Sequence, residues 1–536
     1  MGHIVCALLL TCEVATREQA NCFACDMARK AERCFCLSKK IYFDRIKVYF
    51  ANGIYYMARQ INSTKKNGRI FTPEFIVSNI LDFVGYRGPS ILKQNIMDNS
   101  CGDGAFLKEI VARYCVEALK KHYSLELLKS DLEKFIYGLE LDPVQCAICA
   151  QNLEYVANQY GVFQVKWNIR CTDSLDVANY NNKMDYVVGN PPYVRVHNIS
   201  NLQKIKQLTF TKSGMVDLYI AFFEIGLKML KNAGKLCYIT PSSYFTSVAG
   251  KTMREYFVKN NLLTKVIDLK HSQVFDATTY NAITLLSKQK NDKKIDYFEY
   301  DLSNKNYFFV EELVPEEFFI NHKFYFGPKE KLKSLRSIIL HTPIFNHHTI
   351  EVKNGFATLY DNFFIQDSFP FEDYIIPILK SSTGKWKKCF FPYKNGQLIP
   401  LKTLEKNKLI KQYYEQNKDN LTSRDIDSKD SWWGFGRTQG LKDINKIKYS
   451  INSLVKTIKD IKLIPCKKGE GTYSGLYILT DLNLAQLKQI LISQNFIDYI
   501  SMLGKYKNGG CYTFSSKDLK AFLEYSILKI QEQKYA

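Results

Sequence analysis

The chain has 536 residues, of which 46% are apolar and 14% aromatic, and its formal net charge is +21. This length predicts two or three domains, and the apolar fraction is large enough to build hydrophobic cores, which excludes a largely disordered chain. No apolar run reaches the roughly 18 residues that a membrane span requires, so we expect no membrane partner. The positive charge favours a polyanion such as nucleic acid, although a generally lysine-rich composition would give the same excess.

The first 60 residues differ from the rest and contain six of the 15 cysteines, namely Cys6, Cys12, Cys22, Cys25, Cys34 and Cys36. The last four could hold zinc, but the Cys34–Cys36 spacing is short for a zinc finger and no histidine lies nearby, so we expect no metal. The scattered cysteines are typical of a reduced, cytoplasmic protein. We interpret residues 1–60 as an atypical extension, with Met57 as a possible true start.

Two regions that differ in residue pattern and composition follow the extension. Between residues 61 and 327, apolar strands alternate with amphipathic helical stretches, which predicts an α/β domain with a largely parallel sheet. Residues 328–536 are rich in Lys, Tyr, Phe and Asn and predict a mixed α+β domain of short elements, with a turn at Lys394-Asn395-Gly396.

A glycine-rich segment follows the first expected strand. Residues 95–107 read NIMDNSCGDGAFL, so a short strand leads through Asp98 to Gly104, and a helix is expected from Ala105. Small residues let a ligand approach the backbone closely, and the start of a helix offers free N–H groups. The segment has neither the glycine spacing of a dinucleotide fingerprint nor the lysine of a P-loop. It therefore predicts a ligand-binding loop of another kind.

Two further acidic residues lie at the end of an expected strand or just after one. Glu140 ends a second strand in FIYGLELDP (135–143), where a carboxylate is placed to hold both hydroxyls of a ribose. Asp173 follows a third strand and could accept a hydrogen bond from an adenine amino group. Each acid alone could be an ordinary loop or cap residue, whereas the ordered set is more specific.

The segment MDYVVGNPPY (184–193) is the most informative in the chain. Asp185 to Gly189 predict a buried strand, which stops at Asn190-Pro191-Pro192-Tyr193. Two prolines fix φ and remove two backbone donors at the edge where α/β sheets bind ligands. An Asn amide oxygen and a Pro carbonyl can accept hydrogen bonds from a planar NH2 group, and the Tyr ring offers a stacking face. The motif predicts an enzyme that methylates a planar amide or amine; the alternative is a plain strand terminator beside a surface Tyr.

Taken in order, these motifs resemble the N6-adenine DNA methyltransferases of the gamma type, the TaqI-like and Eco57I-like enzymes of type II restriction–modification systems. The resemblance covers about residues 67–290, including DLYIAFF (217–223), GKLCYITPSSY (234–244) and VFDATTYNAITL (274–285). It implies a Rossmann-like S-adenosylmethionine-dependent methyltransferase domain (61–327), followed by a target-recognition domain (328–536).

The resemblance also implies a role for each matching residue. The catalytic motif is Asn190, Pro191, Pro192 and Tyr193. The target base is expected to meet Tyr193 and Phe275, with Tyr280 as a second candidate. The cofactor S-adenosylmethionine is expected to contact Thr72, Asp98, Ser100, Gly102, Gly104, Glu140, Leu141, Asp173, Asn190 and Phe222. In FGRTQGL (435–441) we expect Arg437 and Gln439, flanking Thr438, to read base edges, although a structural turn is as good an interpretation.

The expected reaction is methyl transfer from S-adenosylmethionine to N6 of an adenine that is flipped out of duplex DNA. The expected genetic partner is a cognate restriction endonuclease, and the expected state is a monomer. The first alternative is a single-chain restriction–modification enzyme, but a nuclease module needs on the order of 100 residues and only about 65 precede the first motif. A protein-glutamine methyltransferase, an RNA methyltransferase and an inactive DNA-binding protein are the others.

Overall fold

The structure is a computed structural model that describes residues 72–195, 202–275, 279–289, 292–341 and 349–535. Its contacts divide the chain into two units, Met1–Arg69 and Ile70–Ala536, of which only the second is described below. The cysteine-containing extension and Met57 lie outside the described residues. The predicted boundary at residues 327 and 328 falls inside the second unit and stays a prediction.

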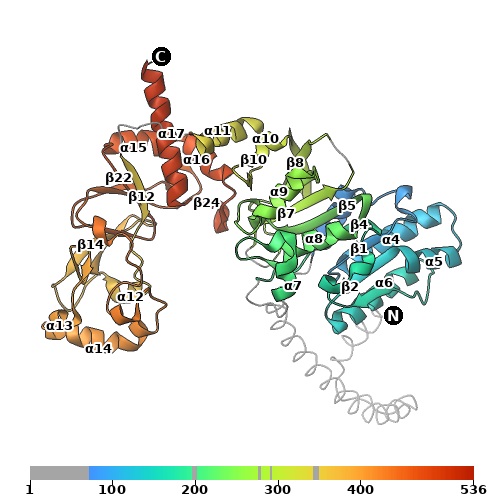
Figure 1. Ribbon diagram of the computed structural model, residues 1–536, viewed down its shortest axis with the longest axis horizontal. Helices are drawn as coiled ribbons and strands as arrows, with labels where there is room; N and C mark the ends of the chain where they lie inside the picture. The colour runs from blue at the N-terminus through green and yellow to red at the C-terminus, as the bar shows by residue number, and fades with distance from the viewer. Residues whose placement is uncertain (1–71, 196–201, 276–278, 290–291, 342–348, 536) are drawn as a thin grey trace, which may run out of the picture. The chain divides into compact units, whose positions relative to one another are not determined.

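A nine-stranded sheet organises the first part of this unit (Figure 1). The strand order is β3-β2-β1-β4-β5-β7-β6-β8-β9; β1 to β5 run parallel, whereas β7 is antiparallel to both of its neighbours. The strands are β1 (Ile96–Asp98), β2 (Ile136–Glu140), β3 (Asn168–Cys171), β4 (Met184–Gly189), β5 (Leu230–Pro241), β6 (Leu263–Asp268), β7 (Asn281–Ser287), β8 (Ile295–Asp301) and β9 (Asn306–Leu313). The predicted α/β fold with a mainly parallel sheet is confirmed.

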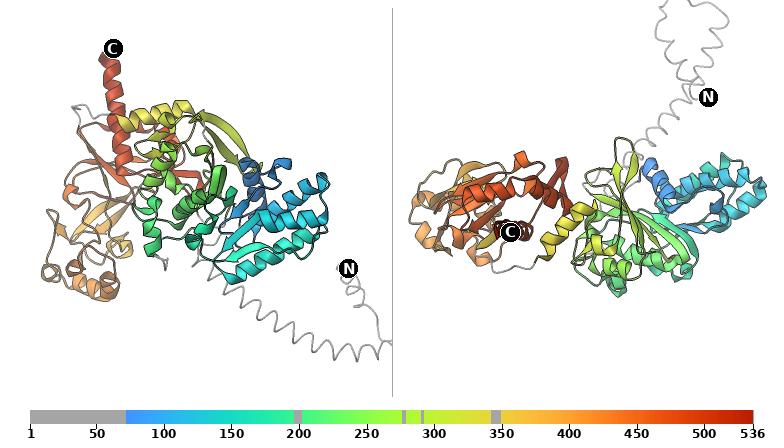
Figure 2. Two further views of the ribbon diagram at one scale, coloured as in Figure 1. Left: turned by 45° about the vertical axis from the view of Figure 1, so that its right-hand side comes forward. Right: turned by 90° about the horizontal axis from the view of Figure 1, so that it is seen from above.

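Hydrophobic cores form on both faces of this sheet because successive strand residues point to opposite sides. Val187 belongs to one core and Val188 to the other, and Leu236 and Cys237 alternate in the same way. One face is covered by helices drawn in blue to cyan, namely α3 (Glu74–Val84), α4 (Ala105–Lys120), α5 (Leu125–Phe135) and α6 (Pro143–Asn158) (Figure 2). The other face is covered by α8 (Leu218–Met229) and α9 (Lys251–Lys259). A short helix, α7 (Leu202–Gln207), precedes α8.

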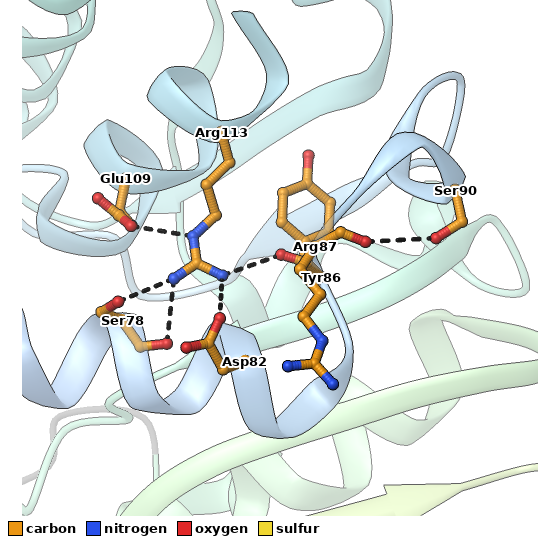
Figure 3. A network of polar contacts seen from close by, with 7 residues as sticks. All are labelled: Ser78, Asp82, Tyr86, Arg87, Ser90, Glu109 and Arg113. Carbon is orange, nitrogen blue, oxygen red and sulfur yellow. Dashed lines mark hydrogen bonds and ion pairs between the residues drawn. The ribbon is translucent and has the colours of Figure 1, made fainter. Parts of the chain in front are cut away.

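Hydrogen bonds and ion pairs of Arg113 connect α3 to α4 (Figure 3). Its guanidinium donates to the Asp82 carboxylate at 2.7 Å and to the Tyr86 carbonyl at 3.1 Å. It also donates to the Ser78 hydroxyl at 2.9 Å and to Glu109, one turn earlier on α4, at 2.9 Å. Because α3 follows Thr72 and α4 follows the glycine-rich loop, this network fixes two predicted cofactor-binding segments relative to each other.

The remaining described residues build five smaller sheets and a set of helices. The sheets are ordered β10-β11, β12-β22-β18-β20, β13-β15-β14-β21, β16-β17 and β19-β24-β23. The strands are β10 (Phe319–Ile320), β11 (Lys323–Phe324), β12 (Ile350–Asn354), β13 (Ile365–Gln366), β14 (Ile375–Lys380), β15 (Lys385–Phe390), β16 (Tyr393–Lys394), β17 (Gln397–Leu398), β18 (Lys448–Ile451), β19 (Leu454–Val455), β20 (Leu463–Cys466), β21 (Gly471–Tyr473), β22 (Leu476–Thr480), β23 (Tyr506–Lys507) and β24 (Cys511–Thr513). The helices are α10 (Pro315–Phe318), α11 (Lys329–Leu340), α12 (Asp361–Phe364), α13 (Leu401–Leu404), α14 (Lys408–Thr422), α15 (Leu484–Leu491), α16 (Gln494–Met502) and α17 (Ser516–Tyr535). Within the described residues, no helix is both long enough and apolar enough to cross a membrane.

One hydrophobic core continues from the large sheet into the C-terminal part. It contains Val266 and Leu286 of the sheet together with Phe496 and Leu523 of α16 and α17. A further core, built from buried residues between Phe356 and Ile444 together with Tyr473, belongs to the C-terminal part alone. The C-terminal elements are therefore joined to the sheet by buried apolar side chains.

Candidate active site

The candidate site lies where the strand order reverses at the carboxyl edge of the sheet. Parallel strands β2 and β4 flank β1, with Asp98 level with Gly138 and Val188. Open α/β sheets bind ligands in the crevice at such a reversal. The glycine-rich loop follows β1, and the Asn-Pro-Pro-Tyr motif follows β4.

The glycine-rich loop has the backbone conformation that its small residues permit. Gly102 and Gly104 have φ of 53° and 90°, in the left-handed region, and α4 begins at Ala105 as predicted. A Cβ atom on Gly104 would lie 2.9 Å from the Cys149 sulfur, whereas one on Gly102 would meet nothing within 4 Å. Gly104 therefore allows α6 to approach the loop, and Gly102 borders open space that a ligand could occupy.

Asp98 ends β1 as a buried carboxylate, 1% exposed. Its Oδ1 accepts a hydrogen bond from the Ser100 backbone N–H at 3.0 Å. Burial raises the pKa of this carboxyl from 3.8 to about 7; the Ser100 N–H opposes the rise and the nearby acids Glu140 and Asp103 add to it. A Cβ atom on Gly189 would lie 2.7 Å from the same Oδ1, so the last residue of β4 is pressed against the last residue of β1.

Glu140 links the glycine-rich loop to the end of β2. Its carboxylate accepts from the Gly102 N–H at 3.0 Å and from the Asp142 N–H at 2.9 Å. Leu141, the next residue, is 67% exposed. Directly after β3, the Thr172 N–H donates to the Glu140 carbonyl at 2.8 Å. The Asp173 carboxylate caps the short helix that follows by accepting from Leu175 N–H at 3.0 Å, which is the ordinary cap role left open by the sequence.

The Asn-Pro-Pro-Tyr motif is held at both ends by side chains. The Asn190 amide nitrogen donates to the Thr72 hydroxyl at 3.1 Å, so a segment 118 positions earlier orients the amide. The Tyr193 hydroxyl accepts from the Asn281 amide at 2.9 Å and donates to the Ile239 carbonyl at 3.4 Å. Burial raises the pKa of Tyr193 well above its ordinary value, so this hydroxyl stays protonated. Pro191 is buried and Pro192 is half-buried.

Aromatic rings surround Tyr193. Its ring meets Tyr219 and Phe275 edge-to-face, at centroid distances of 6.3 Å and 6.5 Å. Phe275, the residue predicted to meet the target base, thus lies beside the motif and is 8% exposed. Phe222, predicted to contact the cofactor, lies 6% exposed on α8 within the hydrophobic core.

The two predicted DNA-reading residues are engaged within the protein. Arg437 donates to the Asp425 carbonyl at 2.7 Å and lies 3.3 Å from the Asp427 carboxylate. The Gln439 amide donates to the Gly355 carbonyl at 2.7 Å and lines an open cavity of about 510 Å³. A base contact by Arg437 would require its guanidinium to leave these acids, so its role stays a prediction.

Sequence reasoning did not assign a role to two asparagines at this edge, Asn281 and Asn99, whereas it predicts Ser100 as a cofactor contact. Asn281 starts β7 and holds Tyr193. Asn99, 1% exposed, accepts from the Tyr238 hydroxyl at 2.9 Å. The Asn99 amide nitrogen and the Ser100 hydroxyl are buried and have no hydrogen-bond partner among the described residues. Buried polar atoms usually have partners, so these two point to a ligand contact at the loop. In the described part of the chain, His, Cys, Asp and Glu side chains form no group of three that could hold a metal ion.

The strand order, the antiparallel β7 and the residues at the carboxyl edge define a Rossmann-like methyltransferase fold of the S-adenosylmethionine-dependent type, as predicted. Two solved structures share the fold across most of this chain. The type IIL restriction–modification enzyme MmeI in complex with DNA covers 83% of this chain and 63% of its own, with a TM-score of 0.58 and 11% identity. The second is a nuclease-deletion mutant of the type ISP restriction–modification enzyme LlaGI in complex with a DNA substrate mimic. The match covers 77% of this chain and 42% of the LlaGI chain, with a TM-score of 0.50 and 12% identity.

Sequence comparisons show which proteins the chain is similar to. Residues 117–275 match the family model of the Eco57I restriction-modification methylase. The type II methyltransferase M.BstVI of Geobacillus stearothermophilus is 25% identical over 425 residues, which cover 69% of this chain and 74% of that protein. The type II restriction enzyme and methyltransferase RM.Eco57I of Escherichia coli is 28% identical over 282 residues, 42% of this chain but only 28% of that protein. The predicted resemblance to the gamma-type methyltransferase family is confirmed, and the likenesses support a DNA methyltransferase of a restriction–modification system.

Proposed function

We propose that the protein is a site-specific DNA methyltransferase that transfers a methyl group from S-adenosylmethionine to N6 of an adenine flipped out of duplex DNA. The observation that carries the proposal is the meeting of three segments at one sheet edge. The glycine-rich loop is tied to Glu140, the end of β4 is pressed against Asp98, and Thr72 orients Asn190.

The residues at the loop fit S-adenosylmethionine, which would supply an electrophilic methyl group on a sulfonium. Gly102 borders open space, and the buried Ser100 hydroxyl and Asn99 amide offer hydrogen bonds. Glu140 is placed to accept from the ribose hydroxyls, as carboxylates at this position do in Rossmann folds. The buried Asp98 carboxylate would favour a positively charged cofactor, because a nearby cation stabilises its ionised form.

Asn190 and Pro191 would act on the nucleophile. The N6 amine of adenine is a poor nucleophile because its lone pair is delocalised into the ring. Hydrogen bonds from N6 to the Asn190 amide oxygen and the Pro191 carbonyl would localise that lone pair on nitrogen. Such an arrangement works by positioning and by fixed dipoles rather than by a strong base. The proton would leave N6 after transfer, so no titrating side chain is required in the motif.

Tyr193 and Phe275 would hold the flipped base. The target amine cannot be reached inside the duplex, so the base must leave the stack. Aromatic stacking is worth roughly 1–3 kcal/mol per base, which offsets part of the unstacking cost. The hydrogen bonds of the Tyr193 hydroxyl to Asn281 and Ile239 support a ring that is held in place before the base arrives.

The C-terminal part would bind and read the DNA. A net charge of +21 favours a polyanion, and phosphate contacts by Lys and Arg give an affinity that falls steeply with salt. A cognate restriction endonuclease is the partner that type II modification implies, and cytoplasmic location follows from a DNA substrate in a bacterium. A single-chain restriction–modification enzyme is the second candidate, because RM.Eco57I combines both activities by its name.

The decisive experiment supplies radiolabelled S-adenosylmethionine and mixed-sequence duplex DNA to the purified protein, digests the DNA to nucleosides and identifies the labelled one. The proposal expects N6-methyl-2′-deoxyadenosine. Label in N4-methyl-2′-deoxycytidine would overturn the base assignment, and DNA that stays unlabelled would overturn the substrate. DNA cleavage in the same reaction would favour the single-chain alternative.

The matched variants are Asn190→Ala and Asn179→Ala. The first removes the amide that we assign to N6, and the second removes an exposed amide on the short helix Ala178–Tyr180. We expect Asn190→Ala to lose at least about 100-fold in turnover, as when a single group that stabilises a transition state is removed, and to bind cofactor nearly as the parent does. Asn179→Ala should match the parent in both. Near-normal turnover by Asn190→Ala would refute the mechanism.

A further inference from the structure

A hairpin of the C-terminal part reaches the start of strand β7. It consists of β23 (Tyr506–Lys507), the turn at Asn508–Gly510, and β24 (Cys511–Thr513). The Asn508 amide oxygen accepts from the Tyr280 hydroxyl at 3.2 Å and from the Gln273 amide at 3.4 Å. Tyr280 directly precedes β7, and Gln273 lies two positions before Phe275. One exposed side chain at the hairpin turn therefore contacts both sides of the segment that we assign to the target base.

Packed aromatic side chains stabilise the contact between the hairpin and the start of β7. The His271 ring packs edge-to-face against Tyr506 at 4.8 Å and Tyr512 at 5.0 Å, and against Tyr280 at 6.2 Å. The Tyr506 hydroxyl donates to the Asp268 carboxylate, at the end of β6, at 3.0 Å. Both of these residues are at least nine-tenths buried. Separations of about 4.5–7 Å are those at which aromatic pairs attract each other, so the hairpin cannot move without disturbing the end of β6 and the start of β7.

Asn281, the first residue of β7, connects this contact to the catalytic motif. The Tyr280 carbonyl accepts from the Ser242 N–H at 2.8 Å and from its hydroxyl at 3.1 Å, which fixes the backbone where β7 begins. The next residue, Asn281, is 1% exposed and donates its amide to the Tyr193 hydroxyl at 2.9 Å. The hairpin turn is thus separated from Tyr193 by two adjacent residues, Tyr280 and Asn281.

We propose that the hairpin Tyr506–Thr513 positions Tyr193 for capture of the target base, with Asn508, Tyr280 and Asn281 as positioning residues. The inference rests on the proposed function and adds to it how the C-terminal part acts on the catalytic motif. The C-terminal part, which we propose reads the DNA, then influences the base-capture step through Tyr280 and Asn281, because the hairpin belongs to that part of the chain. We expect DNA affinity and cofactor affinity to be independent of this contact.

The test compares Asn508→Ala and Tyr280→Phe with the control Asn420→Ala. Asn420 is an exposed asparagine on α14 whose amide donates to the Tyr360 hydroxyl at 3.2 Å, so the control breaks a similar Asn–Tyr bond away from β7. A single neutral hydrogen bond is worth about a two- to ten-fold change in an equilibrium. We expect both test variants to lose turnover by about this factor, with DNA and cofactor dissociation constants unchanged. 2-Aminopurine at the mapped target position should show a matching loss of unstacked base, and the control should show none.

A double-mutant cycle separates positioning from general loosening. Tyr193→Phe removes the hydroxyl that Asn281 binds, so Asn508→Ala should have no further effect on turnover in that background. Full additivity, or test variants that capture the base as the parent does, would overturn the inference. If the parent protein itself does not methylate DNA, the proposed function has failed instead, and the two failures are told apart by the parent alone.

Discussion

Replacement of Asp98 by Asn removes a buried carboxyl and keeps its shape. Burial raises the pKa of Asp98 from 3.8 to about 7 in the folded protein, whereas the unfolded chain exposes the group to water. The folded state therefore keeps a proton on Asp98 at pH values at which the unfolded state has released it. The difference between the two pKa values corresponds to about 4 kcal/mol of unfolding free energy.

The sign follows from which state binds the proton more tightly. Because the pKa is raised in the folded state, the stabilising contribution is complete below about pH 4 and is lost as the pH rises to about 7. Asparagine has no proton to lose. Without cofactor, Asp98→Asn should therefore match the parent near pH 4 and exceed it in stability by up to about 4 kcal/mol above pH 7.

Urea unfolding of both proteins, followed by circular dichroism between pH 4.5 and 8, measures this difference. Subtracting one curve from the other cancels the ionisable groups that the two proteins share. The reasoning is refuted if the difference stays constant with pH, or if the parent gains stability relative to the variant as the pH rises.

Substitutions at four further positions test the site and its support. Glu140→Ala should weaken cofactor binding by about ten-fold or more, measured by calorimetry, because the Gly102 N–H loses its charged acceptor. Tyr193→Ala should lose roughly 1–3 kcal/mol in base capture, read from 2-aminopurine fluorescence, whereas Tyr193→Phe keeps the stacking face and should lose less. Gly189→Ala should cost at least about 2 kcal/mol in urea unfolding, since φ is 153° and the new Cβ would lie 2.7 Å from the Asp98 carboxylate. Arg113→Met should cost about 2 kcal/mol in the same assay by leaving Asp82 and Glu109 without their cation, and Arg113→Lys should recover part of it.

Features set by local sequence could be predicted. The buried strand expected at residues 185–189 is β4, Met184–Gly189, and the helix expected from Ala105 begins there. The turn expected at Lys394-Asn395-Gly396 joins β16 to β17, with φ of 52° and 77° at its last two residues. Such features depend on glycine, proline and the apolar pattern within a short stretch of neighbouring residues. A single sequence is therefore enough to predict them.

Features set by distant contacts could not be predicted. Asn281 reaches Tyr193 only because β7 inserts antiparallel between β5 and β6, and no local pattern gives that strand order. The bonds of Arg113 likewise depend on how α3 lies against α4. For Arg437 the sequence could not show that two aspartates, Asp425 and Asp427, lie within 3.6 Å of its guanidinium.

The hydrophobic core shared by the large sheet and helices α16 and α17 limits how such a protein can be re-engineered. Cutting the chain after residue 327 would expose apolar side chains of the sheet, so a fragment lacking the C-terminal part should aggregate rather than fold by itself. A graft that changes DNA specificity should instead replace the residues of the separate core within 356–444, and leave Tyr506 and the last two helices in place. The segment that related proteins could exchange would then be the one that builds the separate core, and not everything that follows residue 327.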